Sequence, residues 1–319
     1  MIGIVGSGAF GTALAVGYGK YGRDVRLYCR SGETALLIEK SRQNSGRLPG
    51  IDLPGSVTAT ADIETLRNCA AVLLCLPMQS LRGFLAENAA RLDGLALISC
   101  SKGIDLATLA GPTAIMALAC PNSECGVLTG PSFAKDIAAG LPTALTLGCK
   151  SSLGESLQHL LSTPTLRLYR TTDIIGAELG GALKNVMAIA AGLIMGAGLG
   201  ESARAAVVTR GHAEMVRLSM ALNARPETLA GLSGLGDLVL TCTSIQSRNL
   251  RFGMALGAGR VPESGQTVEG VATAKAAADL AQKLAIDLPI ATMVAAVISK
   301  TISLDRAIQT LMSRPLKQE

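Results

Sequence analysis

A glycine-rich turn near the amino terminus constrains the fold of this chain more than any other feature. The apolar run Ile2–Val5 leads into Gly6-Ser7-Gly8-Ala9-Phe10-Gly11, which has the spacing G-x-G-x-x-G. An Ala-rich stretch of helical character, Ala9–Gly19, follows, and then a second apolar run, Val25–Tyr28. A turn with this spacing inside a strand–helix–strand unit is typical of a dinucleotide-binding α/β fold, whereas a purely structural turn is the alternative.

Each glycine of this turn has a physical task in such a fold. Gly6 permits the tight turn, Gly8 lets the backbone approach a pyrophosphate, and Gly11 lets helix and strand pack closely. The start of the helix offers free N–H groups and the positive end of its dipole to the phosphates. We therefore expect Gly6, Gly8 and Gly11 to bind a dinucleotide.

The end of the second strand discriminates between dinucleotides. Sites selective for NAD place an acidic residue there, about 20 residues after the glycine turn, to bind a ribose hydroxyl. This chain has Tyr28-Cys29-Arg30-Ser31 instead. A guanidinium can pair with a 2′-phosphate, so Arg30 favours NADP(H), with NAD(H) possible. A solvated arginine is the alternative interpretation.

The rest of the chain divides into two kinds of sequence. Apolar runs at residues 70–76, 95–99, 127–128 and 144–147 alternate with helical patterns. Runs that are apolar on both faces are typical of a buried parallel sheet, so we predict a doubly wound α/β domain over residues 1–173. After about Thr172 the segments are longer and Ala-rich, which predicts a helical second domain over residues 174–319.

Composition excludes several classes of function. The net charge of +5 is dispersed, and aromatic residues make up 3% with no Trp, so we expect no nucleic-acid partner. The eight Cys contain no C-x-x-C pair and the chain has two His, so we predict reduced thiols and no metal site.

The same composition bears on location and assembly. The strongest membrane candidate, residues 186–199, is shorter than the roughly 20 residues that a span needs, so we expect no integral membrane span. With no basic leader visible at the start, we expect a cytoplasmic protein. Charged residues make up only 17%, which favours burial between subunits, and we expect a homodimer.

A lysine in an apolar helical stretch is the first candidate for chemistry. Lys184 lies in Gly180-Gly181-Ala182-Leu183-Lys184-Asn185, where it either extends its amine to solvent or is held in a cleft. If it is held, it is suited to proton transfer. Asp237, in Gly234-Leu235-Gly236-Asp237-Leu238, is a candidate partner, or the cap of a helix or turn.

Three further segments offer positive charge and hydrogen-bond donors. Lys102 follows an expected strand, so it should lie at the carboxyl edge of the sheet, where ligands bind. The turn at residues 130–134 and the segment Gln246-Ser247-Arg248-Asn249 add hydroxyl, amide and guanidinium groups. Each alone is more often a surface loop, but together they suit a phosphorylated substrate.

These motifs, in this order, resemble the bacterial NAD(P)-dependent glycerol-3-phosphate dehydrogenase family. The segments that carry the resemblance are GSGAFGTAL at residues 6–14, NSGRLPG at 44–50, SKGI at 101–104, GPSFAK at 130–135, ALKN at 182–185, GLSGLGDLVLTCTS at 231–244, QSRN at 246–249 and VEG at 268–270. The resemblance covers nearly the whole chain.

The resemblance implies an N-terminal Rossmann-type domain, a C-terminal all-helical domain, and reversible reduction of dihydroxyacetone phosphate to sn-glycerol 3-phosphate for phospholipid synthesis. It implies that Lys184 is the catalytic proton donor and acceptor and Asp237 the acid of the pocket. The implied substrate contacts are Lys102, Gly130, Ser132, Lys184, Asp237, Ser247, Arg248 and Asn249. The implied cofactor contacts are Phe10, Arg30, Lys102, Ala134, Arg248 and Glu269.

The chain departs from the family pattern at three positions. Phe10 replaces a frequent Trp and Ala9 a frequent Ser, while Arg47 stands where an aromatic residue is common. Two alternative functions remain open at this point. One is a β-hydroxyacid dehydrogenase acting on a carboxylate, and the other is a non-catalytic NADP(H)-sensing protein, which would need no proton donor.

Overall fold

The computed structural model describes residues 1–263, 265 and 267–315. The chain forms two compact units. Unit 1 comprises residues 1–102 and 110–178, and unit 2 comprises residues 103–109 and 179–319, of which the last four lie outside the described residues.

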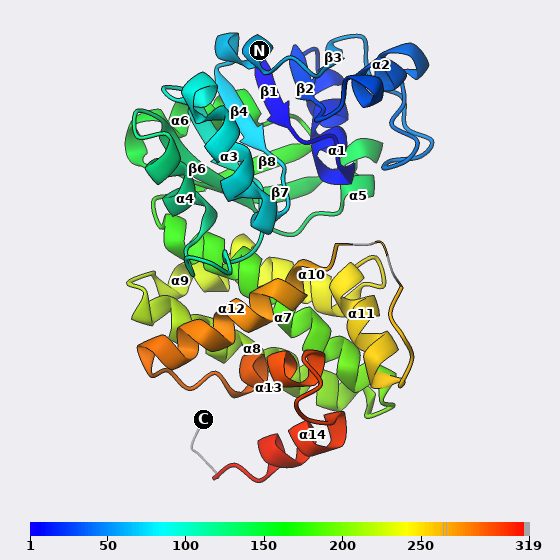
Figure 1. Ribbon diagram of the computed structural model, residues 1–319, viewed down its shortest axis with the longest axis vertical. Helices are drawn as coiled ribbons and strands as arrows, with labels where there is room; N and C mark the ends of the chain where they lie inside the picture. Colours follow the sequence, from blue (N-terminus) through cyan, green and yellow to red (C-terminus); the bar gives the residue numbers. More distant parts are fainter. Residues whose placement is uncertain (264, 266, 316–319) are drawn as a thin grey trace. The chain divides into compact units, whose positions relative to one another are not determined.

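Unit 1 contains an eight-stranded sheet with the order β3-β2-β1-β4-β5-β6-β7-β8 (Figure 1). The strands are β1 (Ile2–Val5), β2 (Val25–Tyr28), β3 (Val57–Thr60), β4 (Ala71–Leu74), β5 (Ala96–Ser99), β6 (Glu124–Thr129), β7 (Thr143–Gly148) and β8 (Leu166–Thr171). All neighbouring strands are parallel except β6 and β7, whose pairing is antiparallel. The predicted doubly wound α/β fold is confirmed, and its last two strands run in the opposite direction to the other six.

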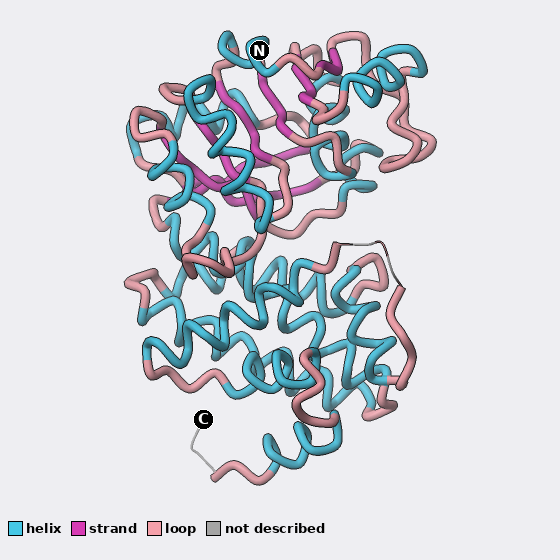
Figure 2. Tube along the Cα trace, in the orientation of Figure 1, coloured by secondary structure: helices cyan, strands magenta, loops and turns pink. Residues whose placement is uncertain are grey.

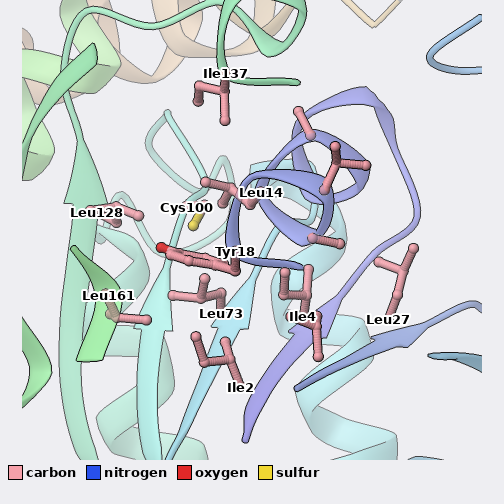
Figure 3. Packing of buried hydrophobic residues seen from close by; sticks show 14 of the residues in the cluster. Ile2, Ile4, Leu14, Tyr18, Leu27, Leu73, Cys100, Leu128, Ile137 and Leu161 are labelled. Carbon is pink, nitrogen blue, oxygen red and sulfur yellow. The ribbon is translucent and has the colours of Figure 1, made fainter. Parts of the chain in front are cut away.

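Helices cover both faces of this sheet and bury its side chains. The helices and the 3₁₀ segment of the unit are α1 (Ala9–Gly19), α2 (Gly32–Ser41), η1 (Ile63–Asn68), α3 (Met78–Leu92), α4 (Pro112–Ala119), α5 (Ala134–Ala139) and α6 (Ser151–Leu161). On one face, α1, α2, α5 and α6 contribute to a core in which Tyr18 and Leu14 of α1 lie over Ile2, Ile4 and Leu73 (Figure 3). On the other face, α3 and α4 pack with η1 over alternate residues of the same strands.

Unit 2 is helical throughout its described elements (Figure 2). These are α7 (Ile174–Gly196), whose first turn belongs to unit 1, α8 (Gly200–Ala221), α9 (Pro226–Ala230), the π-helical segment η2 (Leu232–Gly236), α10 (Asp237–Thr243), α11 (Arg248–Gly257), α12 (Glu269–Leu284), α13 (Pro289–Ile298) and α14 (Leu304–Met312). Their apolar faces enclose a separate core that includes Val186, Ile189 and Leu218. The predicted helical second half is confirmed.

Helix α7 is longer than the apolar stretch that the sequence indicates. It has 23 residues and continues through Glu178 and Lys184, and its most apolar window has a mean hydropathy of 1.5. By length and composition it is the one helix among the described residues that could cross a membrane, so length alone does not exclude a span. However, 83% of that window is buried inside the protein, as in the core helix of a folded domain.

Candidate active site

The glycine turn between β1 and α1 has the shape that a dinucleotide requires. Gly6 has a φ of +106°, and a Cβ there would lie 2.6 Å from the Cys75 carbonyl oxygen. A Cβ at Gly11 would lie 2.0 Å from the Gly6 carbonyl oxygen, whereas a Cβ at Gly8 would meet nothing within 4 Å. The first and third glycines are therefore required by packing, and the second faces open space, which fits close approach of a pyrophosphate.

The start of α1 is suited to bind an anion. Gly8 is the N-cap residue, so no side chain at that position covers the first N–H groups of the helix. The first turn contains no acidic residue. The N–H groups and the positive end of the helix dipole thus remain directed at the turn, which is the physical basis of phosphate binding in this kind of fold.

The two predicted cofactor contacts near the turn lie at its edge. Phe10 is half-buried and packs against the core beneath α1. Arg30 is exposed and follows the buried Cys29 at the end of β2, one residue before the N-cap residue of α2, Ser31. This position leaves the guanidinium accessible to a ligand.

A second group of predicted residues gathers at the ends of β5 and β6. The Lys102 amine donates a hydrogen bond to the Gly130 carbonyl oxygen at 3.1 Å, and the Ser132 hydroxyl donates to the same oxygen at 3.4 Å. Because β5 and β6 are parallel neighbours, their carboxyl ends meet at one edge of the sheet. Gly130 has a φ of +135°, and a Cβ there would crowd Leu145. Ala134 follows as the first residue of α5.

The strongest feature of unit 2 is a buried ion pair. The Lys184 amine lies 3.0 Å from the Asp237 carboxylate, with side-chain exposures of 11% and 1%. Lys184 therefore does not extend into solvent, and Asp237, although it begins α10, directs its carboxylate to the lysine. A lysine paired in this way is held in one position with its charge balanced, as a proton donor requires.

Glycine residues explain how α7 and η2 come close enough for this pair. Gly180 and Lys184 are four residues apart, so they share one face of α7. A Cβ at Gly180 would lie 2.4 Å from the Ser233 carbonyl oxygen. Ser233 is in turn four residues before Asp237, so direct backbone packing at Gly180 brings the carboxylate beside the amine one turn further on.

Cys242 lies near the same pair but cannot serve as its acid or base at neutral pH. The pKa of its thiol is raised to about 12, chiefly by burial, with Lys184 and Arg204 lowering it and Asp237 raising it. The thiol therefore stays protonated and neutral.

The start of α11 gathers the remaining predicted residues. The buried Ser247 hydroxyl accepts the Leu250 N–H at 3.2 Å, which caps the helix, and lies 2.9 Å from the Thr241 hydroxyl. Arg248 is exposed as the first residue of the helix. The positive end of this helix and the guanidinium together suit an anionic group.

Asn249 is held by two partners. Its side-chain amide donates to the Asn185 oxygen at 2.8 Å, and its oxygen accepts the Gly270 N–H at 3.0 Å. This bridge joins α7 beside Lys184 to the first turn of α12, where the predicted cofactor contact Glu269 stands. Sequence reasoning did not single out Asn185, although its position next to Lys184 in a buried helical stretch was an available signal.

The predicted residues thus form four groups. The glycine turn with Arg30, and Lys102 with Gly130 and Ser132, belong to unit 1, whereas the Lys184–Asp237 pair and the start of α11 belong to unit 2. Among the described residues no cluster of three or more potential metal ligands occurs.

Comparison with known proteins identifies the chain. Residues 1–153 match the N-terminal part of NAD-dependent glycerol-3-phosphate dehydrogenases and residues 173–309 match their C-terminal part. The glycerol-3-phosphate dehydrogenases [NAD(P)+] of Cereibacter sphaeroides and Paracoccus denitrificans are 60% and 57% identical, covering 100% of this chain and 100% and 99% of their own lengths. The crystal structure of glycerol-3-phosphate dehydrogenase from Coxiella burnetii has a TM-score of 0.93 at 34% identity and covers 98% of both chains. The chain belongs to the NAD(P)-dependent glycerol-3-phosphate dehydrogenase family.

Proposed function

We propose that this protein catalyses the reversible NAD(P)H-dependent reduction of dihydroxyacetone phosphate to sn-glycerol 3-phosphate, a precursor of glycerophospholipids. The observation that carries the proposal beyond family membership is the buried Lys184–Asp237 pair. A protein that only senses NADP(H) would have no need for an ammonium group held in this way.

The pair supplies what reduction of a ketone requires from the protein. When bound, the reduced nicotinamide provides the hydride for the carbonyl carbon. Lys184 donates a proton to the carbonyl oxygen, and its positive charge stabilises the alkoxide as it develops. Asp237 holds the amine in position and balances its charge, so that the lysine is ready before the substrate arrives. In the reverse direction Lys184 accepts the proton from the hydroxyl group.

The remaining groups bind the cofactor and the substrate phosphate. Gly6, Gly8 and Gly11 hold the pyrophosphate, with Phe10, Arg30, Lys102, Ala134, Arg248 and Glu269 as further cofactor contacts. Substrate contacts are Lys102, Gly130, Ser132, Ser247, Arg248 and Asn249, in addition to the catalytic pair. Hydrogen bonds and positive charge on the phosphate orient the triose while the carbonyl reacts.

Three wider assignments complete the proposal. Residues 1–173 form the dinucleotide-binding domain and residues 174–319 the substrate domain. The enzyme acts in the cytoplasm as a homodimer, which accords with its low proportion of charged residues, 17%. NADP(H) is the preferred cofactor and NAD(H) an alternative, because Arg30 takes the place of the acid typical of NAD-selective sites.

The test is the oxidation of NADPH on addition of dihydroxyacetone phosphate, followed by absorbance. We expect turnover with this substrate and none when the purified enzyme is given NADP+ and 3-hydroxyisobutyrate. Lys184→Met should lower kcat about 10²–10⁴-fold while NADPH still binds, as measured by calorimetry. Full turnover in that variant, or activity on the hydroxy acid alone, contradicts the proposal.

The cofactor preference has its own test. Arg30→Ala should raise the KM for NADPH about tenfold or more and leave the KM for NADH nearly unchanged, because only NADPH carries the 2′-phosphate. An equal rise for both cofactors would remove the reason for assigning NADP(H) as the preferred one.

A further inference from the structure

A loop between α2 and β3 lies against the glycine turn. The first part of this connection, residues 42–53 and called the 42–53 loop below, contains the segment NSGRLPG, whose role the catalytic scheme leaves unassigned. The Asn44 side-chain amide donates two hydrogen bonds of 2.8 Å, one to the Ser7 carbonyl oxygen within the turn and one to the Thr12 hydroxyl in α1. Asn44 is only 7% exposed, so these bonds are shielded from water.

The 42–53 loop is itself firmly anchored, so it can act as a support. The Arg42 guanidinium donates to the carbonyl oxygens of Pro54 and Val57 at 2.8 and 2.7 Å, and the Leu53 N–H donates to the Arg42 carbonyl oxygen at 2.8 Å. Leu48 is 2% exposed and packs in the core beneath α1. The Asn44 amide is thus presented from a rigid loop.

The bond to Ser7 fixes the direction of the next N–H group. The carbonyl of Ser7 and the N–H of Gly8 belong to one planar trans peptide and point in opposite directions. Because Asn44 holds the Ser7 carbonyl toward the 42–53 loop, the Gly8 N–H, at the N-cap of α1, points away from that loop.

We propose that Asn44 is a positioning residue for cofactor binding, which holds the Ser7–Gly8 peptide in the orientation that receives the pyrophosphate. This inference rests on the proposed function insofar as it takes the glycine turn as the pyrophosphate site. Preorganised donors bind more tightly because no ordering of the turn is needed when the ligand arrives. Asn44 touches neither cofactor nor substrate in this scheme.

The test compares two variants of Asn44 with a control from the same loop. Asn44→Ala removes both hydrogen bonds. Asn44→Asp keeps the shape of the side chain but turns an acceptor toward the Ser7 carbonyl, so it loses the donor without creating a cavity. Gln43→Ala is the matched control, because the half-buried Gln43 donates its amide to Asp52 at 2.7 Å in a solvent-exposed bond within the loop. Binding of ADP-ribose, which contains the pyrophosphate, and of 2′-AMP, which lacks it, is measured by calorimetry without substrate.

We expect both Asn44 variants to bind ADP-ribose and NADPH about tenfold more weakly, as the loss of one or two ordinary hydrogen bonds predicts, while 2′-AMP binding stays unchanged. The kcat at saturating NADPH and the KM for dihydroxyacetone phosphate should not change, and Gln43→Ala should match the parent throughout. Unchanged ADP-ribose affinity in both variants overturns the inference, and so does an equal loss for both ligands, which would mean a damaged domain. Failure of the proposed function would instead appear as ADP-ribose binding without turnover of NADPH.

Discussion

Removing the charge of Asp237 is the most direct perturbation of the buried Lys184–Asp237 pair. Asp237→Asn keeps the shape of the side chain and one oxygen facing Lys184, but it removes the negative charge that lies beside the ammonium. The resulting loss of stability depends on how deeply the two side chains are buried. Exposed ion pairs contribute at most about 1 kcal/mol to stability, whereas breaking a buried pair by removing one partner costs about 3–5 kcal/mol.

The exposures of the two side chains decide between these cases. Asp237 is 1% exposed and Lys184 11% exposed, and their 3.0 Å separation is that of a hydrogen-bonded pair. We therefore expect Asp237→Asn to lower the free energy of unfolding by about 3–5 kcal/mol, and Lys184→Met to lower it similarly by removing the positive charge beside the buried carboxylate. The double variant Lys184→Met/Asp237→Leu should recover most of the loss, because no buried charge remains.

Urea denaturation at pH 7, followed by far-UV circular dichroism, measures these differences. The coupling energy follows from a double-mutant cycle made of Lys184→Met, Asp237→Leu and their double variant. The activity assay runs in parallel, where each single variant and the double variant should lose about 10²–10⁴ in kcat. A loss of stability below about 1 kcal/mol for Asp237→Asn, or additive losses in the cycle, would show that the pair behaves as a surface pair. The reasoning from burial would then be refuted.

Three further perturbations test other parts of the structure. Gly11→Ala should greatly weaken NADPH binding in calorimetry, because its Cβ would lie 2.0 Å from the Gly6 carbonyl oxygen. By contrast, a Cβ at Gly83 meets nothing within 4 Å, so Gly83→Ala should stabilise α3 by about 0.5–1 kcal/mol. Burial raises the pKa of Glu214 from 4.5 to about 7, so the folded state holds its proton more tightly and stability should fall by about 3 kcal/mol as pH rises from about 4.5 to 7. Glu178, whose pKa burial also raises to about 7, adds a slope of the same sign. Urea titrations across this range should show the combined slope, and Glu214→Gln should reduce it by the Glu214 share of about 3 kcal/mol. An unchanged slope in the variant would refute the assignment to Glu214. Ser247→Ala removes the cap of α11 and should lower the free energy of unfolding by about 1 kcal/mol, and a wild-type value would mean that the hydroxyl does not cap.

The parts of the fold that sequence predicted are those set by local patterns. The turn at residues 6–11 was recognisable because spacing and flanking apolar runs occur within one short unit. Strands β3 and β8 were not predicted, because VTAT and LRLYRT lack the continuous apolar character of the central strands. The antiparallel pairing of β6 and β7 could not be predicted either, since strand direction is determined by how the chain crosses the sheet.

The candidate site was predictable in its residue types more than in its contacts. A lysine within an apolar helix is equally compatible with an amine that extends to solvent, and its partner Asp237 lies far along the chain. Only the structure, in which α7 packs directly against η2 at Gly180, shows that the Lys184 amine and the Asp237 carboxylate meet. Asn249, likewise, was expected to contact substrate, and its bonds to Asn185 and Gly270 became apparent only from the arrangement of three helices.

The place of Lys184 within α7 also affects the chain before it folds. A newly made 23-residue segment of this hydropathy resembles one that a translocon would insert into lipid. A lysine near the middle of such a segment disfavours insertion by about 2.5–3.5 kcal/mol. The amine to which we assign the proton transfer thus also biases the nascent helix toward water, and substitution of Lys184 by an apolar residue would remove both effects at once.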